Sequence, residues 1–391
     1  MDSPSENGIS DDHNGEADSS DTPSTPGKSF EPAFTVKVTE AVKNGDAVLY
    51  TVCSKEVTGD TPEVTVSRQF EDFEWLQHCL MIKDNVAGVI FPPLPPKPIV
   101  DSKSAEKQTK KQLGKDAKVL MGDTFVKDCR SIEKYLKLVV NHPELGSDNT
   151  LRKFLTEEEA PVRTKVKQGL LTKLSSAVSR KDSKKDIEEY FQKERDWVND
   201  YAVLIKEMSS AFNKVVYAEQ RLSVAHSHLS ASLNSGGAER DDDSTELSKS
   251  LVKFSEAIED MKHSLDVDII NNGRTLGFQL ELYARFLQSA KDMLHQRTSL
   301  LIQYEDANRA FDKAKPQKKD AAEQAKQAAE TAFESCSDIA RSELKRFHQA
   351  RIYALQEGLV KYADAKIKTS RDTYALLAKS LTALKQLDSG E

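Results

Sequence analysis

The residues that could perform covalent or metal chemistry are few and scattered. His226 and His228 alternate on a predicted helix without an obvious carboxylate or thiol partner, so a metal site is not expected. The sequence contains no nucleotide-binding glycine loop, HExxH pair or serine-nucleophile motif. Its four cysteines are too dispersed for a zinc ribbon or a redox pair, and we interpret them as reduced thiols: Cys53, Cys79, Cys129 and Cys336. We therefore expect no enzyme activity, no metal and no cofactor.

The chemistry that the spacing does support is electrostatic attraction combined with apolar burial. Valines and leucines recur at steps of four between Val162 and Val178, and basic residues such as Arg163, Lys165 and Lys167 lie beside them. A helix with one narrow apolar face and a basic remainder binds anionic bilayers. The alternative is a helix that docks on a neighbouring domain. On the first interpretation, Leu170 and Leu174 insert between the lipids.

Composition separates the chain into regions. Residues 1–31 carry eight acids against one base, which equals the net charge of −7 of the whole 391-residue chain. This segment has almost no large apolar residues, so we predict a disordered acidic tail. Twelve of the thirteen prolines lie in the first 161 residues, and only Pro316 interrupts the remainder. No apolar run reaches membrane-spanning length, and no secretory signal is recognisable. We predict a cytoplasmic protein that meets membranes only at their surface.

The pattern over residues 32–159 predicts an α+β domain. Two β-branched runs flank Asn44-Gly45, a strong hairpin signal, and a third run follows at 62–70. A helix over 71–82 precedes the proline-rich segment FPPLPPKP at 91–98, which ring-locked φ angles make rigid. An amphipathic helix ending near His142-Pro143 and a short helix around LRKFL complete a three-stranded meander with helices.

Three long heptad-like stretches follow in residues 186–391. The first ends at the glycines after Asn234, the second runs from about 244 to 313 with a bend expected near Gly273 and Gly277, and the third covers about 318–387. Helices of this length must pack side by side as an antiparallel bundle. Because the apolar stripes are wide, one is expected to remain uncovered until two copies pair. The alternative is a monomeric coiled-coil linker.

The motifs SRQFEDFEWL, GVIFPPLPPKP, NHPEL and LRKFL resemble a phox-homology (PX) domain in their order and spacing. With the basic helix over 160–185 and the three-helix rod over 186–391, the chain resembles a PX-BAR sorting nexin of the sorting nexin 5/6 subgroup. The resemblance implies an α+β PX domain followed by an all-α BAR domain that forms a crescent-shaped dimer.

The resemblance also identifies a phosphoinositide pocket, but with altered residues. The aromatic position is Phe70 and the lysine after the prolines is Lys97, whereas Gln69 and Asp128 occupy the positions of two arginines. Gln lacks the charged fork that grips a phosphate, and Asp repels it. Arg68 points to the other side of the strand and is a poor substitute. We therefore predict weak or absent binding of phosphatidylinositol 3-phosphate.

The subgroup further implies a groove that captures the cytoplasmic tails of cargo receptors by β-augmentation. Phe125 falls at the groove aromatic of the family, although a plain core role is equally compatible with the sequence. For the rod, the resemblance implies a cationic membrane face. The candidates are the lysines around Pro316 and a basic run on the last helix: Lys313, Lys315, Lys318, Lys319, Lys345 and Arg346.

The resulting functional prediction is an endosomal membrane-remodelling and cargo-sorting adaptor, peripheral on early endosomes and their tubules. Its implied partners are phosphoinositides and other anionic lipids, a sorting nexin 1/2-type BAR partner, retromer, cargo tails and dynactin, with no nucleic acid. The alternative is a dimeric scaffold for protein interactions that does not bend membranes.

Overall fold

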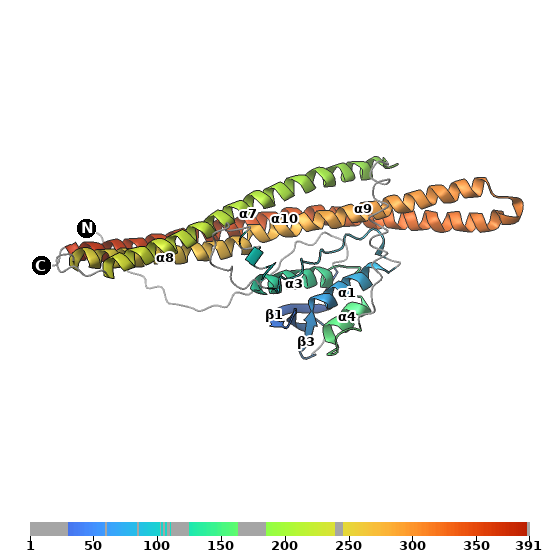
Figure 1. The fold of residues 1–391 in the computed structure, drawn as a ribbon. Coiled ribbons are helices and arrows are strands. Elements are labelled where there is room, and N and C mark those ends of the chain that lie inside the picture. The colour runs from blue at the N-terminus through green and yellow to red at the C-terminus, as the bar shows by residue number, and fades with distance from the viewer. Residues whose placement is uncertain are drawn as a thin grey trace, which may run out of the picture. The chain divides into compact units, whose positions relative to one another are not determined.

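The computed structural model describes residues 30–58, 61–83, 86–101, 103, 104, 106, 107, 110, 125–162, 185–238 and 245–388. The chain divides into the units Met1–Glu31 and Pro32–Glu391, and every element below belongs to the second. Figure 1 shows a small α+β part and a set of long helices.

The small part begins with a three-stranded antiparallel sheet in the order β1-β2-β3: β1 Phe34–Asn44, β2 Ala47–Glu56 and β3 Val64–Gln69. The β1–β2 turn is confirmed where the hairpin signal placed it, with Gly45 at a φ of 61° that favours glycine. A register shift between Val38 and Glu40 leaves the Val38 N–H to donate to Glu133 Oε2 at 2.9 Å. This bond ties the edge strand to a helix 95 residues away.

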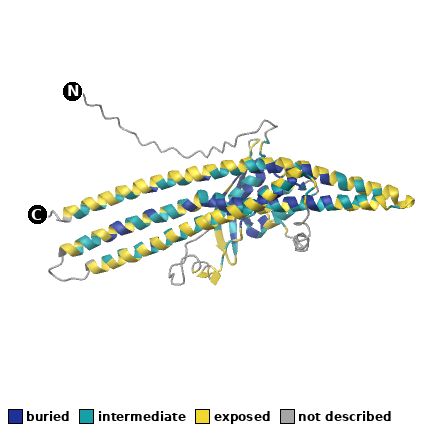
Figure 2. Ribbon diagram, turned by 90° about the horizontal axis from the view of Figure 1, so that it is seen from above, coloured by how far each residue is buried: buried dark blue, intermediate teal, exposed yellow. Residues whose placement is uncertain are grey.

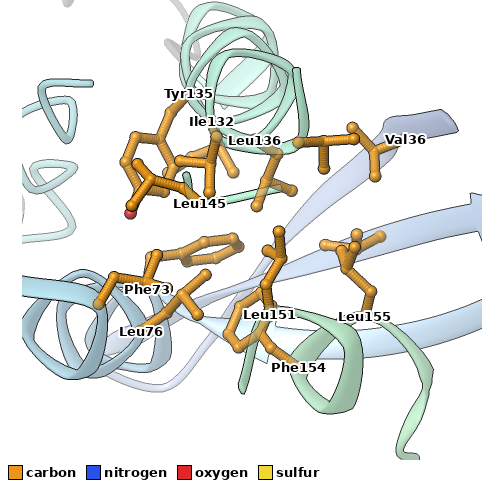
Figure 3. Packing of buried hydrophobic residues seen from close by; sticks show 14 of the residues in the cluster. Val36, Phe73, Leu76, Ile132, Tyr135, Leu136, Leu145, Leu151, Phe154 and Leu155 are labelled. Atoms are coloured by element: carbon orange, nitrogen blue, oxygen red, sulfur yellow. The ribbon is translucent and has the colours of Figure 1, made fainter. Parts of the chain in front are cut away.

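Helices α1 (Phe70–Met81), α3 (Phe125–Val140) and α4 (Asn149–Thr156) enclose the core of this part. Alternate residues of β1 point inward, and each helix contributes one apolar face at three- and four-residue spacing. Figure 3 shows Phe73 and Leu76 of α1 packed with Leu136 of α3 and Phe154 of α4.

The long helices are α7 (Glu189–Ala238), α8 (Thr245–Arg274), α9 (Leu276–Asp312) and α10 (Lys319–Asp388), with a short 3-10 turn at Pro316–Lys318. At 1.5 Å per residue, the 70-residue α10 is about 105 Å long. It packs along both α8 and α9, while α7 packs on the same two helices (Figure 1). We call this assembly the rod.

One sequence expectation about the rod is wrong and another is confirmed. α7 does not end at Asn234-Ser-Gly-Gly but continues through it to Ala238, since a glycine costs a helix only about 1 kcal/mol. The break expected near Gly273 and Gly277 is confirmed at Thr275, between the two glycines. Gly277 matters there because a Cβ would lie 2.8 Å from the Asn272 carbonyl oxygen and 2.9 Å from Phe212 Cε1. Gly273 has open space around it.

A buried carboxylate lies at the contact between the α+β part and the rod. Glu343 of α10 accepts the Ile90 backbone N–H at 3.1 Å, and its Oε2 lies 3.1 Å from His142 Nε2. His142 Nδ1 accepts the Glu144 N–H, which leaves Nε2 to carry the proton that is donated to Glu343. Nearby, the backbone at Gly88 approaches the Cys336 carbonyl so closely that a Cβ would lie at 2.4 Å.

Candidate functional site

The predicted phosphoinositide pocket begins at the junction of β3 and α1. Gln69 is the last residue of the strand and caps the helix, and its N–H donates to Asp72 Oδ2 at 2.7 Å. Phe70 is 3% exposed and belongs to the domain core. Phe70 therefore offers little surface on which an inositol ring could stack.

The charges around this junction are mainly negative. Lys97 is 56% exposed, and its Nζ pairs with Glu71 Oε1 at 2.5 Å. The pKa of the buried Tyr50 hydroxyl is raised, first by desolvation and then by the fields of Asp128 and Glu71. Both carboxylates therefore lie near the buried Tyr50, and their negative charge would disfavour a phosphate bound beside them.

The structure places Arg68 away from this junction. Its guanidinium is buried and donates to the Phe154 carbonyl from Nε at 3.1 Å and from Nη2 at 2.9 Å, and also to the carbonyls of Glu157 and Glu158. Arg68 thus satisfies carbonyls at the C-terminal end of α4, which a helix leaves without internal partners. It has to be removed from the set of pocket residues, because its donors are used in the fold.

Several predicted site residues lie outside the described residues. Phe125 begins α3, but its side chain is not described. The same holds for the whole segment 163–184. It contains the predicted lipid-binding residues Arg163, Lys165, Lys167, Leu170 and Leu174.

The structure brings four predicted lysines together at one end of the rod, where α9 turns into α10 (Figure 1). Lys313 caps α9, Lys315 precedes the short 3-10 turn, Lys318 is the last residue of that turn, and Lys319 starts α10. All four side chains are exposed. We call them the tip lysines. They can meet a negatively charged surface without displacing any buried contact.

The basic run on α10 is divided by the fold. Lys345 is exposed, whereas Arg346 pairs with Glu343 beside the contact between the two parts. Arg341 pairs with Glu188 and Asp338, and the Arg351 guanidinium lies 4.4 Å from the Tyr201 ring centroid. Most of this run therefore serves the internal structure of the rod.

Exposed apolar side chains occupy one part of the rod. The described residues between 271 and 351 include no exposed large hydrophobic side chain, whereas α7, both ends of α8 and the second half of α10 carry several. Figure 2 shows exposed positions alternating with half-buried ones along these helices. Two rows have a seven-residue repeat: Met208, Val215, Leu222 and Leu229 on α7, and Tyr353, Val360, Ile367, Tyr374 and Leu381 on α10. We call these rows the heptad stripes. This repeat is the pattern by which helices pack against partner helices.

The described residues can also be compared with the requirements of a metal site, a reactive thiol and a membrane-spanning helix. Among the described residues, no three His, Cys, Asp or Glu side chains are placed to hold a metal ion. None of the four cysteines forms a disulfide, and burial raises the pKa of Cys336 to about 11. In the described part of the chain, no helix is both long and apolar enough to cross a membrane.

Comparisons with known proteins agree with this architecture. Residues 56–158 match the PX domain family, and residues 167–331 match the family described as Vps5 C terminal like. Human sorting nexin-6 is 29% identical over 382 residues, which cover 90% of this chain and 92% of the relative. Mouse sorting nexin-32 is 27% identical over 90% of this chain and 92% of its own length.

A more distant relative and a solved structure are also similar to this chain over most of its length. Human sorting nexin-1 is 25% identical over 85% of this chain and 68% of its own length. The fold is similar to that of the SNX-BAR protein Mvp1, solved as a tetramer by cryo-electron microscopy. The TM-score is 0.54 at 15% identity, over 89% of this chain and 99% of the other. The chain thus carries a PX domain that precedes a Vps5-like helical domain, and along nearly its whole length it is similar to sorting nexins.

Proposed function

We propose that this protein is a dimeric membrane-remodelling adaptor that acts in the sorting of cargo on the cytoplasmic face of early endosomes and their tubules. The observation that carries the proposal is the division of the rod. Its heptad stripes lie on α7 and the second half of α10, while its tip lysines lie at the turn between α9 and α10. One region is suited to pairing with a second BAR domain, and another is suited to anionic lipid.

The PX domain is proposed to contribute recognition without holding phosphatidylinositol 3-phosphate in the usual pocket. Support comes from Gln69, from the Lys97–Glu71 pair and from the acidic field of Asp128 at Tyr50. Cargo tails bound in a groove near Phe125, a sorting nexin 1/2-type partner, retromer and dynactin remain proposals that rest on the family resemblance. The domain limits at residues 31, 159 and 185 stay predictions.

Vesicle binding tests the membrane part of the proposal. The full chain, alone and with a sorting nexin 1-type partner, is sedimented with vesicles of phosphatidylcholine, phosphatidylserine and a phosphoinositide, and the vesicles are imaged by electron microscopy. The double variant Lys318→Gln/Lys319→Gln should bind at least about tenfold more weakly, because each cation near the surface contributes about 1 kcal/mol.

The matched control removes two exposed lysines elsewhere, Lys193→Gln/Lys206→Gln on α7, and should bind like the parent protein. Tubules formed only with the partner present would support remodelling by a heterodimer. Dimers that neither bind nor deform any vesicle would favour the alternative scaffold. If the tip variant and the control variant lose vesicle binding equally, the loss would reflect the net charge of the protein and not the position of the tip lysines.

The segment 160–185 is tested separately. Leu170→Glu/Leu174→Glu should weaken vesicle binding without dissolving the dimer, since apolar insertion is needed in addition to charge. Unchanged binding would make this segment a docking element.

A further inference from the structure

A cavity of about 230 Å³ lies between α7 and α9, away from the tip lysines and from the PX pocket. Its lining combines three basic side chains with an amide and two apolar residues: Arg195, Val198, Asn199, Lys291, Leu294 and His295. No carboxylate contributes to this lining. Such a wall favours a negatively charged occupant.

Arg195 is the most deeply placed of these cations, with a side chain only 9% exposed. Its Nη2 donates to Thr298 Oγ1, but its Nε and Nη1 are buried without a protein partner. Leaving charged donors in this state is costly, because burial removes their water and nothing replaces it. A bound acceptor in the cavity would remove that cost.

The carboxylate nearest to Arg195 is already engaged by another arginine. Asp186 Oδ2 lies 3.6 Å from Arg195 Nη2, but the same oxygen pairs with Arg297, whose side chain is fully buried. Arg297 also pairs with Glu188 at 2.5 Å, and Glu188 is shared with Arg341. Two buried arginines therefore share one buried aspartate, which leaves positive charge uncompensated on the cavity side.

Lys291 adds a second cation to the opposite wall of the cavity. Within the described part of the chain, no carboxylate lies within 4 Å of its Nζ. Two of the acids beside the lining residues are engaged on their own helices. Asp196 accepts from Gln192 at 2.9 Å, and Asp292 accepts from Gln288 at 3.0 Å.

We propose that this cavity is a binding site for a single phosphate group, held by Arg195 and Lys291. The volume is below the range of about 300–1,000 Å³ typical of drug-sized ligands, so it suits a small anion or one phosphate of a larger molecule. Inorganic phosphate and an inositol phosphate headgroup share this chemistry. The proposal goes beyond membrane association, which was assigned to other residues.

Calorimetric titration of the full chain with inorganic phosphate, at constant ionic strength set by chloride, tests the site. The parent protein and Lys206→Gln, an exposed lysine of α7 outside the cavity, should bind about one phosphate per chain. Lys291→Gln should weaken binding at least about tenfold, as expected for loss of a charge-assisted hydrogen bond. Asn199→Asp, at an exposed position of the lining, should do the same by placing a carboxylate there.

Absence of phosphate binding by the parent protein would overturn the proposal. Water would then be the acceptor for Arg195 Nε and Nη1. Equal affinity of Lys291→Gln and the parent would overturn it as well. Circular dichroism without phosphate verifies that each variant is folded.

A vesicle arm identifies the source of the phosphate. Weaker binding of Lys291→Gln to phosphoinositide vesicles, together with competition by inorganic phosphate, would assign the site to a lipid headgroup. Unchanged vesicle binding with lost phosphate binding would assign it to a free anion. If neither the parent nor any variant binds vesicles, but the parent binds inorganic phosphate in the calorimeter, the membrane proposal is wrong and the phosphate site is supported.

Discussion

At Gln69 the junction of β3 and α1 offers a neutral side chain where a phosphate needs a cation, and the nearest lysine, Lys97, is held by Glu71. An amide cannot match the charge-assisted bonds of an arginine. We therefore expect the local charges, rather than the backbone, to weaken binding of phosphatidylinositol 3-phosphate.

Reversing these charges should restore affinity. We expect Gln69→Arg/Asp128→Asn to bind phosphatidylinositol 3-phosphate vesicles at least about tenfold more tightly than the parent, since one cation is gained and one repulsive carboxylate is lost. Surface plasmon resonance on vesicles with and without this lipid measures the gain. The control Lys193→Arg, an exposed site on α7, should leave binding unchanged. If the double variant shows no gain in affinity, burial of Phe70 would be the obstacle to lipid binding.

Arg68 should matter for stability and not for lipid. Arg68→Gln leaves carbonyls at the end of α4 without donors, so unfolding free energy should fall by about 2–5 kcal/mol, as measured by urea denaturation. Arg152→Gln breaks an exposed pair with Glu56 and should cost less than about 1 kcal/mol. Similar losses in the two variants would contradict the structural role given to Arg68.

The sequence could predict on which side Arg68 lies but not what it binds. Strand alternation sets its direction, whereas its acceptor at Phe154 lies 86 residues further along the chain. The same limit applies to Arg195 and Lys291, because a cavity between two helices follows from packing and has no local pattern.

Among the elements, the break at Thr275 provides a matched pair of glycines. Gly277→Ala should destabilise the protein by about 1–3 kcal/mol, because its Cβ would overlap the Asn272 carbonyl and the Phe212 ring. Gly273→Ala meets nothing within 4 Å and should stabilise α8 by about 0.5–1 kcal/mol. Thermal unfolding followed by circular dichroism compares them. A destabilising Gly273→Ala would show that α8 needs flexibility at its end.

The long helices were largely predictable because their heptad patterns are strong. The third stretch was expected at about 318–387, and α10 spans Lys319–Asp388. The expected end of α7 at its glycines was wrong, since packing outweighs the local cost of a glycine. Composition could place the break between α8 and α9 only within a few residues, because Gly273 and Gly277 indicate it equally well.

For the molecule as a whole, Glu343 should couple the PX domain to the rod. Glu343→Ala removes the acceptor of the Ile90 N–H and of His142, so the contact should open more often. Hydrogen exchange should then quicken at least about tenfold at Ile90. Glu334→Ala, an exposed change on the same helix, is the control. Unchanged exchange at Ile90 would mean that apolar packing and the remaining polar contacts, such as Lys127–Glu281, hold the two parts together without Glu343.

Pairing of two chains should depend on the heptad stripes. Leu222→Asp/Leu229→Asp should shift the protein to monomer in light scattering, because two leucine side chains lose burial of about 1.5–3 kcal/mol each. Gln324→Glu changes the charge at an exposed site of α10 outside the stripes and should leave the dimer intact. A dimer that persists in the double variant would locate its interface elsewhere.

Because the stripes and the tip lysines occupy different regions, a single chain offers one basic end to a bilayer, whereas two joined chains offer two. Attachment of the second end then becomes an intramolecular event with a high effective concentration. Avidity for lipid is therefore set by how much of the protein is assembled. If the proposed function holds, a cell could release the protein from a membrane by lowering the supply of the second chain, without any change in the lipid.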